Sequence, residues 1–449
     1  MIRKCLVAAI IISALQLGCA TEIGGESPPM GKFHYPIGVT LGPEAKIAYV
    51  VNSNFNAEYK KGSIASVLLD TNDPAGSRIL GSKQGDPLDS RLLIDSFAGN
   101  IAIEKHMRKD DKGEFYRAYV PIRENNAVEV VRIGRTEVKD SSGDSQQVWA
   151  SLSSSGRVMT RRGDPFRVMA DIEVECPGGQ GRGLQIVPML AVLHLARGEM
   201  VFLDLDALDT SLSGGELEQG REVLAGQIDL PGGTNDVAMH PATRELYVTS
   251  RFTSSIEVLT PDPGTLCYHC KFCEQGNTKD GSCVLPDECQ GGWNHRRITV
   301  SNYGAGGTDM RGLAFSTDGS KLYVADRGPN SLLVFDTSIG ENGEPNDKLV
   351  DVAALPASPA MVKYLDRPNP LDDLVLVTCF EDGRLWILDA ETLSVIMASF
   401  AGDGPYEIQA GHLTGLGDVA FVPDFDGASL AMINLNEGPA FGSVLTFIH

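Results

Sequence analysis

The stretch "RGLAFSTDGSKLYVADRGPNSLLVFDTS", residues 311–338, contains three short apolar runs separated by two turns. The runs are rich in Leu, Val, Tyr and Phe, which is typical of strands in closely spaced hairpins. Asp318-Gly319 lies between the first two runs and supplies a residue that accepts a positive φ at a tight turn. The stretch "NDVAMHPATRELYVTSRFTSSIEVLTPD", residues 235–262, has the same order of runs and turns. Two copies of one unit indicate a repeat architecture made of antiparallel sheets.

Weaker copies of the same unit account for the rest of the chain. They begin at residues 35, 97, 164, 358 and 417. With the two clear copies they make seven units, and a ring of such units leaves only short, protected sheet edges. The 49 glycines and 24 prolines of the chain suit a turn-rich β protein. The sequence therefore predicts an all-β, seven-bladed β-propeller over residues 31–449.

The ring also has to be closed where its two ends meet. The last unit, taken from residue 417, contains three strands up to His449. The apolar and aromatic stretch "GKFHY", residues 31–35, lies just ahead of the first unit. We expect this stretch to supply the outermost strand of the last blade, because joining head and tail in this way removes an open sheet edge.

The repeat resembles that of a known family of propellers. Leu246-Tyr247-Val248-Thr249 in one copy and Ala48-Tyr49-Val50-Val51-Asn52 in another are similar to the YVTN-type β-propeller repeat. The resemblance extends over residues 33–448. It implies the propeller fold and says little about function, because propellers host many unrelated activities.

The N-terminus has the features of an export signal. An apolar run at residues 6–17 follows two basic residues and is too short to span a bilayer comfortably. Its end, Leu17-Gly18-Cys19, resembles a bacterial lipobox. We therefore expect residues 1–18 to be a lipoprotein signal peptide, with an ordinary secretory signal as the alternative. In such lipoproteins the cysteine, here Cys19, carries acyl chains that hold the protein at a membrane surface.

The mature chain should then begin with a flexible tether, residues 19–30, that joins the lipid to the propeller. Ala20 follows the lipidated position, and by the sorting pattern of bacterial lipoproteins it favours the outer membrane. We expect a monomer in the bacterial cell envelope that touches the membrane through its lipid anchor only.

The charge of the chain excludes some classes of partner. The formal net charge is -21 at pH 7, and loss of Arg3 and Lys4 with the signal peptide would make it -23. Nucleic acids and anionic lipid surfaces are bound by clusters of Lys and Arg, so a chain this acidic is predicted to bind neither.

A cysteine-rich insert, residues 261–294, follows the third strand of the fourth unit. A sixth cysteine lies in the neighbouring third unit, and the strand order predicts that it shares a face of the ring with the insert. An even set of cysteines outside the cytoplasm favours disulfides. The candidates are Cys176, Cys267, Cys270, Cys273, Cys283 and Cys289.

Zinc is the alternative for this insert, with His269 and His295 as further ligands. Neither Cys270 nor Cys273 is followed by histidine, as the Cys-x-x-Cys-His motif of a c-type haem requires. Cys379 alternates with apolar neighbours and is predicted to be an inert buried thiol.

Carboxylates are the remaining candidates for chemistry. Asp236, Asp309 and Asp418 precede or begin predicted innermost strands, so we expect them at one mouth of the central channel. Propeller hydrolases such as lactonases hold a divalent cation in this region, and calcium suits oxygen ligands. The sequence has no phosphate-binding loop, G-x-S-x-G elbow or H-E-x-x-H motif.

These observations favour a binding protein over an enzyme. We predict a rigid scaffold whose loops recognise an envelope protein or a polysaccharide, with no catalytic residue and no cofactor assigned. The alternative is a metal-dependent, lactonase-like hydrolase that uses the carboxylates at the channel mouth.

Overall fold

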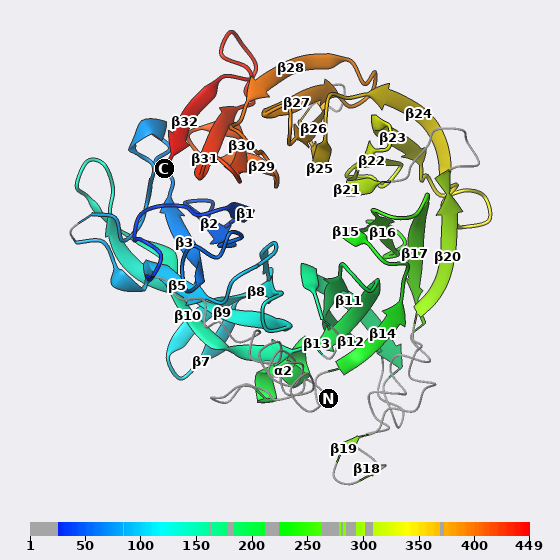
Figure 1. The fold of residues 1–449 in the computed structure, drawn as a ribbon, viewed down its shortest axis with the longest axis horizontal. Helices are drawn as coiled ribbons and strands as arrows, with labels where there is room; N and C mark the ends of the chain where they lie inside the picture. Colours follow the sequence, from blue (N-terminus) through cyan, green and yellow to red (C-terminus); the bar gives the residue numbers. More distant parts are fainter. Residues whose placement is uncertain are drawn as a thin grey trace, which may run out of the picture.

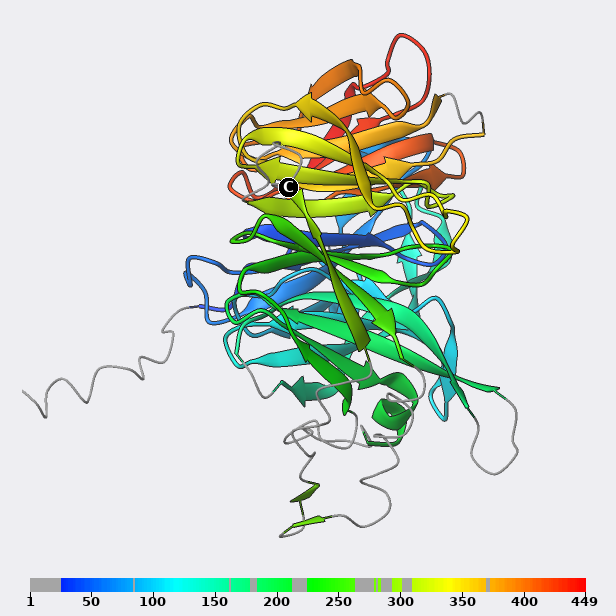
Figure 2. The ribbon, with the colours of Figure 1, turned by 90° about the vertical axis from the view of Figure 1, so that its right-hand side faces the viewer.

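The structure is a computed structural model of the chain. It describes residues 26–83, 85–160, 163–177, 184–211, 224–262, 278–279, 282–283, 293–300, 309–368 and 372–449. Seven antiparallel sheets stand around a central axis as the blades of a propeller, which confirms the predicted fold (Figure 1). Seen from the rim, the ring is a disc with its outermost strands crossing the outside (Figure 2).

The first three blades include the longest strands, which belong to blades 2 and 3. Blade 1 consists of β1 (Pro36–Leu41), β2 (Ile47–Asn52), β3 (Gly62–Leu68), β4 (Arg78–Ile79) and β5 (Arg91–Ile94), with short 3-10 helices at Pro74–Gly76 and Leu88–Ser90. Blade 2 consists of β6 (Ala102–Ile103), β7 (Arg108–Asp110), β8 (Gly113–Ile122), β9 (Ala127–Lys139) and β10 (Ser145–Met159). Blade 3 consists of β11 (Pro165–Pro177), β12 (Leu184–His194), β13 (Glu199–Asp204) and β14 (Leu224–Asp229), with helix α2 (Leu205–Ser211).

The other four blades each have four strands. Blade 4 consists of β15 (Thr234–Met239), β16 (Leu246–Ser250), β17 (Ser255–Pro261) and β20 (Trp293–Thr299). Blade 5 consists of β21 (Met310–Phe315), β22 (Lys321–Arg327), β23 (Asn330–Asp336) and β24 (Lys348–Ala354). Blade 6 consists of β25 (Pro359–Leu365), β26 (Leu374–Cys379), β27 (Arg384–Asp389) and β28 (Val395–Phe400). Blade 7 consists of β29 (Gln409–Leu413), β30 (Gly417–Asp424), β31 (Ser429–Asn434) and β32 (Val444–Ile448).

The innermost strands begin at the face that Figure 1 turns toward the viewer, which we call the front face, and end at the back face. The two middle strands of a blade are buried on both sides by neighbouring blades. These strands are therefore buried along most of their length, as in β2 and β22. The outermost strands are half exposed, as in β24.

The packing of neighbouring blades explains why a tyrosine recurs in the repeat. Tyr49, Tyr247 and Tyr323 occupy matching places in the second strands of blades 1, 4 and 5, and all are buried. The Tyr247 hydroxyl donates to Asp347 Oδ1 of blade 5 at 2.6 Å, and the Tyr323 hydroxyl donates to the Ala390 carbonyl of blade 6 at 2.9 Å. Because a buried phenol needs a hydrogen-bond partner, this residue ties each blade to the next.

The predicted closure of the ring is wrong. Residues 31–35 form no strand, and blade 7 takes all four strands from the C-terminal part of the chain. Its innermost strand is β29, whose short sequence "QAGHL" carries little strand signal, so the seventh unit begins one strand earlier than residue 417. Phe33 instead packs its buried side chain into the apolar cluster between blades 7 and 1.

The predicted tether also ends earlier than expected. The Arg91 guanidinium donates to the Pro28 carbonyl at 2.8 Å, and the Lys60 amide donates to the Glu26 carbonyl at 3.2 Å. Residues 26–30 therefore lie against blade 1, because backbone carbonyls there have partners on the ring. The predicted signal peptide and Cys19 lie outside the described residues. In the part of the chain that the structure describes, no helix has the length and apolarity to cross a membrane.

The residues predicted to form the cysteine-rich insert fall between β17 and β20 along the chain. Its described part is a small hairpin of β18 (Thr278–Lys279) and β19 (Ser282–Cys283). Cys176 and Cys283 are described by backbone only, and the other four disulfide candidates lie outside the described residues, so the disulfides and the zinc alternative stay predictions. Cys379 is a buried free thiol, as predicted. His295, a candidate zinc ligand, contacts the carboxylate of buried Glu257 through Nε2.

Candidate functional site at the front mouth of the channel

The three aspartates that the sequence singled out do not meet. Asp236 lies in β15 and Asp309 immediately precedes β21, so both are at the front half of the channel. Asp418 lies in β30, the second strand of blade 7, and therefore at the back face. There it forms an ion pair with Arg367 at 3.6 Å, and one carboxylate oxygen lies 3.0 Å from His412 Nδ1. Its predicted place at the front mouth is wrong because the seventh unit begins at β29.

Each of the two front carboxylates is bound by an arginine. Arg167 Nε lies 2.6 Å from Asp236 Oδ1, and Arg311 Nε lies 2.6 Å from Asp309 Oδ1. Asp236 also accepts a hydrogen bond from the Leu313 amide at 3.1 Å. Among the residues placed by the structure, no three His, Cys, Asp or Glu side chains are grouped to hold a metal ion.

Arg167 also crosses the channel. Its guanidinium forms a second ion pair with Glu407, which precedes the innermost strand of blade 7. Blades 3 and 7 are not neighbours in the ring, so this pair spans the channel. We call Arg167, Asp236 and Glu407 the channel bridge. It separates the half of the channel lined by blades 4, 5 and 6 from the half lined by blades 1 and 2.

Burial in the channel bridge raises the pKa of Asp236 to about 6, although the Arg167 guanidinium opposes the shift. Glu407 competes for the same guanidinium and adds to the rise. A folded state that binds this proton more tightly than the unfolded chain loses stability as the pH rises from about 4 to about 6.

The Asp236→Asn variant lacks this titration. We expect the unfolding free energy of the native chain, minus that of the variant, to fall by about 2–3 kcal/mol between pH 4 and pH 7. Urea unfolding at four pH values in this window measures the difference. A difference that stays constant with pH would show that Asp236 is ionised in the folded state throughout.

Three arginines with one carboxylate border the front mouth of the channel on the side of blades 4 and 5. Arg311 binds Asp309 through two nitrogens, while Arg251 Nε stays 3.8 Å from the same carboxylate. Arg327 Nε donates to the Pro359 carbonyl at 2.9 Å. We call Arg251, Arg311 and Arg327 the arginine cluster. It carries two more positive charges than Asp309 balances.

The positive charges of the arginine cluster repel one another, and this repulsion affects the pKa values of two of its members. Burial, together with repulsion from Arg311, lowers the pKa of Arg327 to about 10, and the same two causes lower the pKa of Arg251. The Arg311 side chain is only 9% exposed, whereas that of Arg251 is 32% exposed. Positive charges held close together at a water-accessible mouth favour the binding of an anion.

Two more donors come from blades 6 and 7, Lys363 from the innermost strand of blade 6 and Tyr406 from just before that of blade 7. The Lys363 ammonium, on β25, and the Tyr406 hydroxyl have no hydrogen-bond or ion-pair partner among the described residues. Burial lowers the pKa of Lys363 and the Arg167 charge acts in the same direction, although the carboxylates of Glu407 and Asp236 oppose the shift. Burial raises the pKa of Tyr406, so this hydroxyl stays protonated and can donate.

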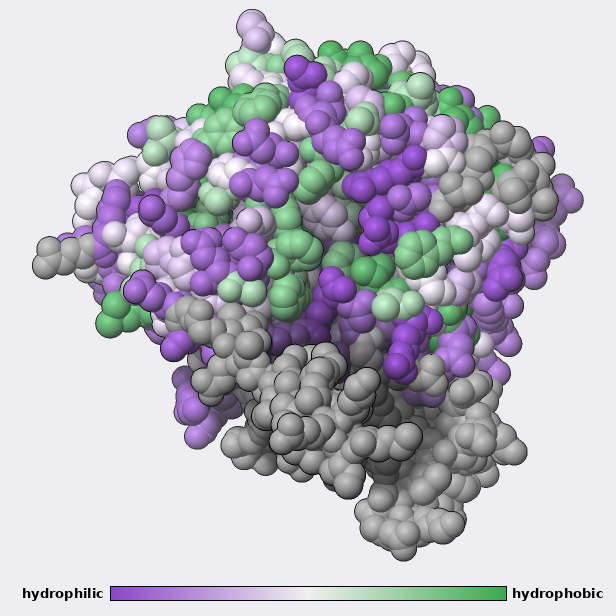
Figure 3. Space-filling view, viewed as in Figure 1, coloured by the Kyte–Doolittle hydropathy of each residue, from purple (hydrophilic) through white to green (hydrophobic). Residues whose placement is uncertain are grey.

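Aromatic side chains cover the other side of the mouth. Phe55 contacts Tyr35, Phe97 and Phe425, with ring centroids 6.5, 6.1 and 5.6 Å apart. Phe380 extends the group at 6.1 Å from Phe425. We call these five residues the aromatic arc, and Phe55 is 52% exposed on it. Figure 3 shows this face, with a central hollow bordered by hydrophilic residues and hydrophobic patches nearby.

Sequence reasoning missed the arginine cluster, although a signal was present. In the two clear copies of the repeat an arginine ends the second strand at the same place, in "LYVTSR", residues 246–251, and "LYVADR", residues 322–327. That place ends at the front face beside the channel. A charged residue that recurs where a strand leaves the core marks a shared surface position.

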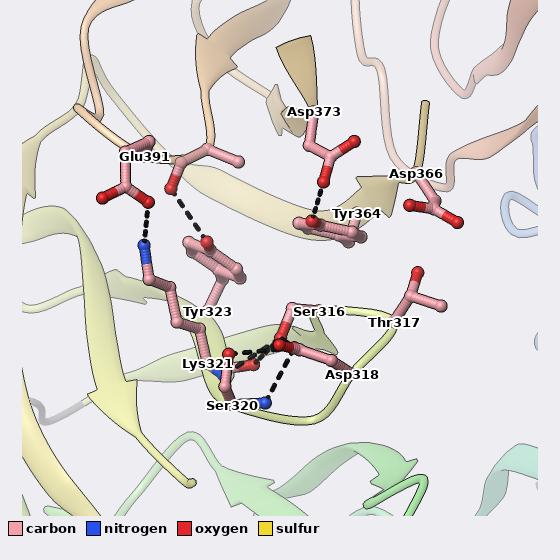
Figure 4. Close-up of a pocket in the computed structure, with 11 residues that line it drawn as sticks. Ser316, Thr317, Asp318, Ser320, Lys321, Tyr323, Tyr364, Asp366, Asp373 and Glu391 are labelled. Carbon is pink, nitrogen blue, oxygen red and sulfur yellow. Dashed lines mark hydrogen bonds and ion pairs between the residues drawn. The ribbon is translucent and has the colours of Figure 1, made fainter. Parts of the chain in front are cut away.

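A second hollow, of about 390 Å³, opens on the back face between blades 5 and 6 (Figure 4). Tyr323 and Tyr364 stack in it with centroids 5.9 Å apart. Its charged groups largely bind one another or the protein, as in the Lys321–Glu391 ion pair of 3.0 Å. Asp318 accepts hydrogen bonds from the residues of its own turn. We therefore place the candidate site at the front mouth.

Comparisons with known proteins add only distant likenesses. No protein-family model matches the chain, and no curated protein matches it significantly. A structure of Kuenenia stuttgartiensis hydrazine synthase is similar at 12% identity and a TM-score of 0.49, over 91% of this chain and 97% of that one. The periplasmic gluconolactonase of Pseudomonas aeruginosa is similar at 15% identity and a TM-score of 0.46, over 81% and 84%.

A Bacteroides fragilis protein described as a candidate 6-phosphogluconolactonase is similar at 12% identity and a TM-score of 0.48, over 86% of this chain and 90% of that one. Likenesses this distant transfer no activity to the chain. The seven-bladed architecture rests on the strand order itself.

Proposed function

We propose that the protein is a binding propeller that recognises an anionic ligand at the front mouth of its channel. The observation that supports this proposal best is the excess of donors. Two guanidinium groups share one carboxylate there, a third binds only a backbone carbonyl, and two further donors have no described partner. Buried or half-buried cations without counter-charges are costly, so a ligand that supplies acceptors is strongly favoured.

The chemistry of arginine indicates which anions fit. The planar guanidinium matches a carboxylate or a phosphate through two parallel hydrogen bonds. Arg311 already binds Asp309 in this way, which leaves Arg251 and Arg327 as the groups free to engage a ligand. The chain has a net charge of -21, so this mouth is a positive site on an acidic molecule, and it selects where an anion can bind.

The aromatic arc adds a second requirement. Rings on the other side of the mouth offer a surface for the apolar part of a ligand, such as the face of a sugar ring or a hydrocarbon segment. A ligand with a carboxylate and an apolar face fits both sides of the mouth. With the lipid anchor predicted at Cys19, the molecules that meet this site would be those of the bacterial envelope.

The metal-dependent hydrolase remains the second hypothesis from the sequence. It required three carboxylates at one mouth, and Asp418 is at the other face. The two that remain are bound by arginines. No described feature favours this activity over binding, so we do not propose it.

The Arg327→Met variant tests the proposed site. We expect the native chain to bind acetate, citrate or inorganic phosphate in isothermal titration calorimetry, and the variant to bind the same anion about tenfold to a hundredfold more weakly, because a charged hydrogen bond is lost. Affinity should also fall with added salt. Arg244→Met is the matched control, because Arg244 is an exposed arginine at the back face.

The control should bind like the native chain. The proposal is contradicted if none of the anions binds the native chain, or if Arg244→Met weakens binding as much as Arg327→Met does.

A further inference from the structure

An exposed phenylalanine lies directly beside the arginine cluster. Phe252 follows Arg251 in the turn after β16, and it is 70% exposed. The Arg251 guanidinium carbon lies 6.0 Å from the centre of the Phe252 ring. On the side of blade 4, the front mouth therefore presents a partly buried cation and an exposed aromatic ring at a short separation.

The backbone beneath Phe252 holds its ring at the edge of the mouth. The Arg251 amide donates to the Gly233 carbonyl at 2.8 Å, which ties this turn to the residue before β15. A Cβ atom on Gly233 would lie 2.6 Å from Phe252 Cδ2 and 2.9 Å from its Cγ, so the ring packs directly on the glycine backbone. Because β15 is the innermost strand of blade 4, the ring lies beside the channel.

Arg251 and Phe252 are neighbours, but they are not stacked on each other. A stacked pair of this molecule, Arg132 on Phe115, has its guanidinium carbon 3.9 Å from the ring centre. At 6.0 Å, Arg251 leaves most of the Phe252 ring uncovered. A ligand can therefore engage the guanidinium and the ring together without first breaking a close contact between them.

The surroundings of the ring favour a flat apolar group over a sugar, because a bound sugar needs hydrogen-bond partners for its hydroxyl groups. Ser250 Oγ donates to the Gly232 carbonyl at 2.9 Å and accepts from the Phe252 amide at 3.2 Å. Thr253 Oγ1 accepts from Ser255 Oγ at 3.3 Å. Both hydroxyl groups beside the ring thus have partners within the turn. An aromatic ring needs no such partners and gains from offset stacking on Phe252.

We propose that the anionic ligand is an aromatic carboxylate, whose carboxylate binds the arginine cluster at Arg251 while its ring stacks on Phe252. This inference rests on the proposed function and names the ligand class of the same site. A charged hydrogen bond of about 2.8 Å and an offset stack of about 4.5–7 Å can both form across the 6.0 Å separation. A single negative charge suits the site, because Asp309 Oδ1 lies 3.8 Å from Arg251 Nε and repels a more highly charged ligand.

The test compares benzoate with acetate in calorimetric titrations of the full chain. We expect benzoate to bind the native chain about tenfold more tightly than acetate does, because its ring adds a stacked contact. Phe252→Ala should weaken benzoate binding about tenfold and leave acetate binding unchanged, whereas Phe252→Tyr should keep the preference for benzoate. Arg251→Met should weaken the binding of both anions.

Phe400→Ala is the matched control, because Phe400 is 54% exposed on β28, the outermost strand of blade 6. This control should bind benzoate like the native chain. Since Phe252 is largely exposed, Phe252→Ala should also keep the native unfolding midpoint.

The inference is overturned if benzoate binds no better than acetate, or if Phe252→Ala leaves benzoate affinity unchanged. It is also overturned if Phe400→Ala weakens benzoate binding as much as Phe252→Ala does, or if glucuronate, a sugar acid, binds better than benzoate. In each of these cases a loss of acetate binding in Arg327→Met would still support the proposed function.

Discussion

Replacement of Arg167 by methionine is expected to lower the free energy of unfolding by about 3–5 kcal/mol at pH 7. The variant leaves Asp236 and Glu407 in the channel without the cation that binds both. Removal of one partner from a buried ion pair costs far more than the pair contributes, because an uncompensated charge remains. Urea unfolding followed by circular dichroism measures the loss.

The size of this effect should depend on pH. Loss of the guanidinium raises the pKa of Asp236 above the value of about 6 that it has in the native chain. Protonation then removes the uncompensated charge, so the loss of stability in Arg167→Met should be smaller at pH 5 than at pH 8.

A neutral version of the channel bridge is the sharpest control. The triple variant Arg167→Met, Asp236→Asn, Glu407→Gln carries no charge in the bridge and should recover most of the lost stability. Arg244→Met, at the exposed back face, should change the free energy of unfolding by less than about 0.5 kcal/mol. A loss below about 1 kcal/mol in Arg167→Met would show that water compensates the two carboxylates and that the bridge is not a closed ionic contact.

The sequence was sufficient to predict the blades because their signals are local. Asp318-Gly319 at a tight turn and the buried tyrosine in the second strand recur unit by unit, and each follows from the geometry of one hairpin. The front position of Asp236 and Asp309 followed from the same repeat. These predictions needed no knowledge of how distant blades meet.

The charge pairs across the ring could not be predicted in this way. Arg167 binds Glu407 although 240 residues separate them, because the ring brings blade 3 opposite blade 7. The misplacement of Asp418 has a related cause. The short β29, with its glycine and histidine, lacks the alternation of a strand, so the unit boundary was set one strand late and the residue was assigned to the opposite face.

The second large loss of stability is expected where the ring closes, between blades 7 and 1. Phe33→Ala is expected to lower the free energy of unfolding by about 3–5 kcal/mol, because it leaves a cavity in the apolar cluster that joins blades 7 and 1. Phe33 is 2% exposed there, in a cluster that draws side chains from the strands of both blades. Phe33→Leu keeps most of the volume and should lose less than about 1.5 kcal/mol.

The location of the damage distinguishes closure from a general loss of packing. Phe335→Ala removes a buried phenylalanine of blade 5 and should cost a similar amount, so it is the matched control. Native-state hydrogen exchange of Phe33→Ala should accelerate in the strands of blades 1 and 7, whereas Phe335→Ala should leave those strands protected. If both variants raise exchange evenly around the ring, Phe33 does not hold blades 7 and 1 together locally. Closure would then depend on the contacts between all seven blades.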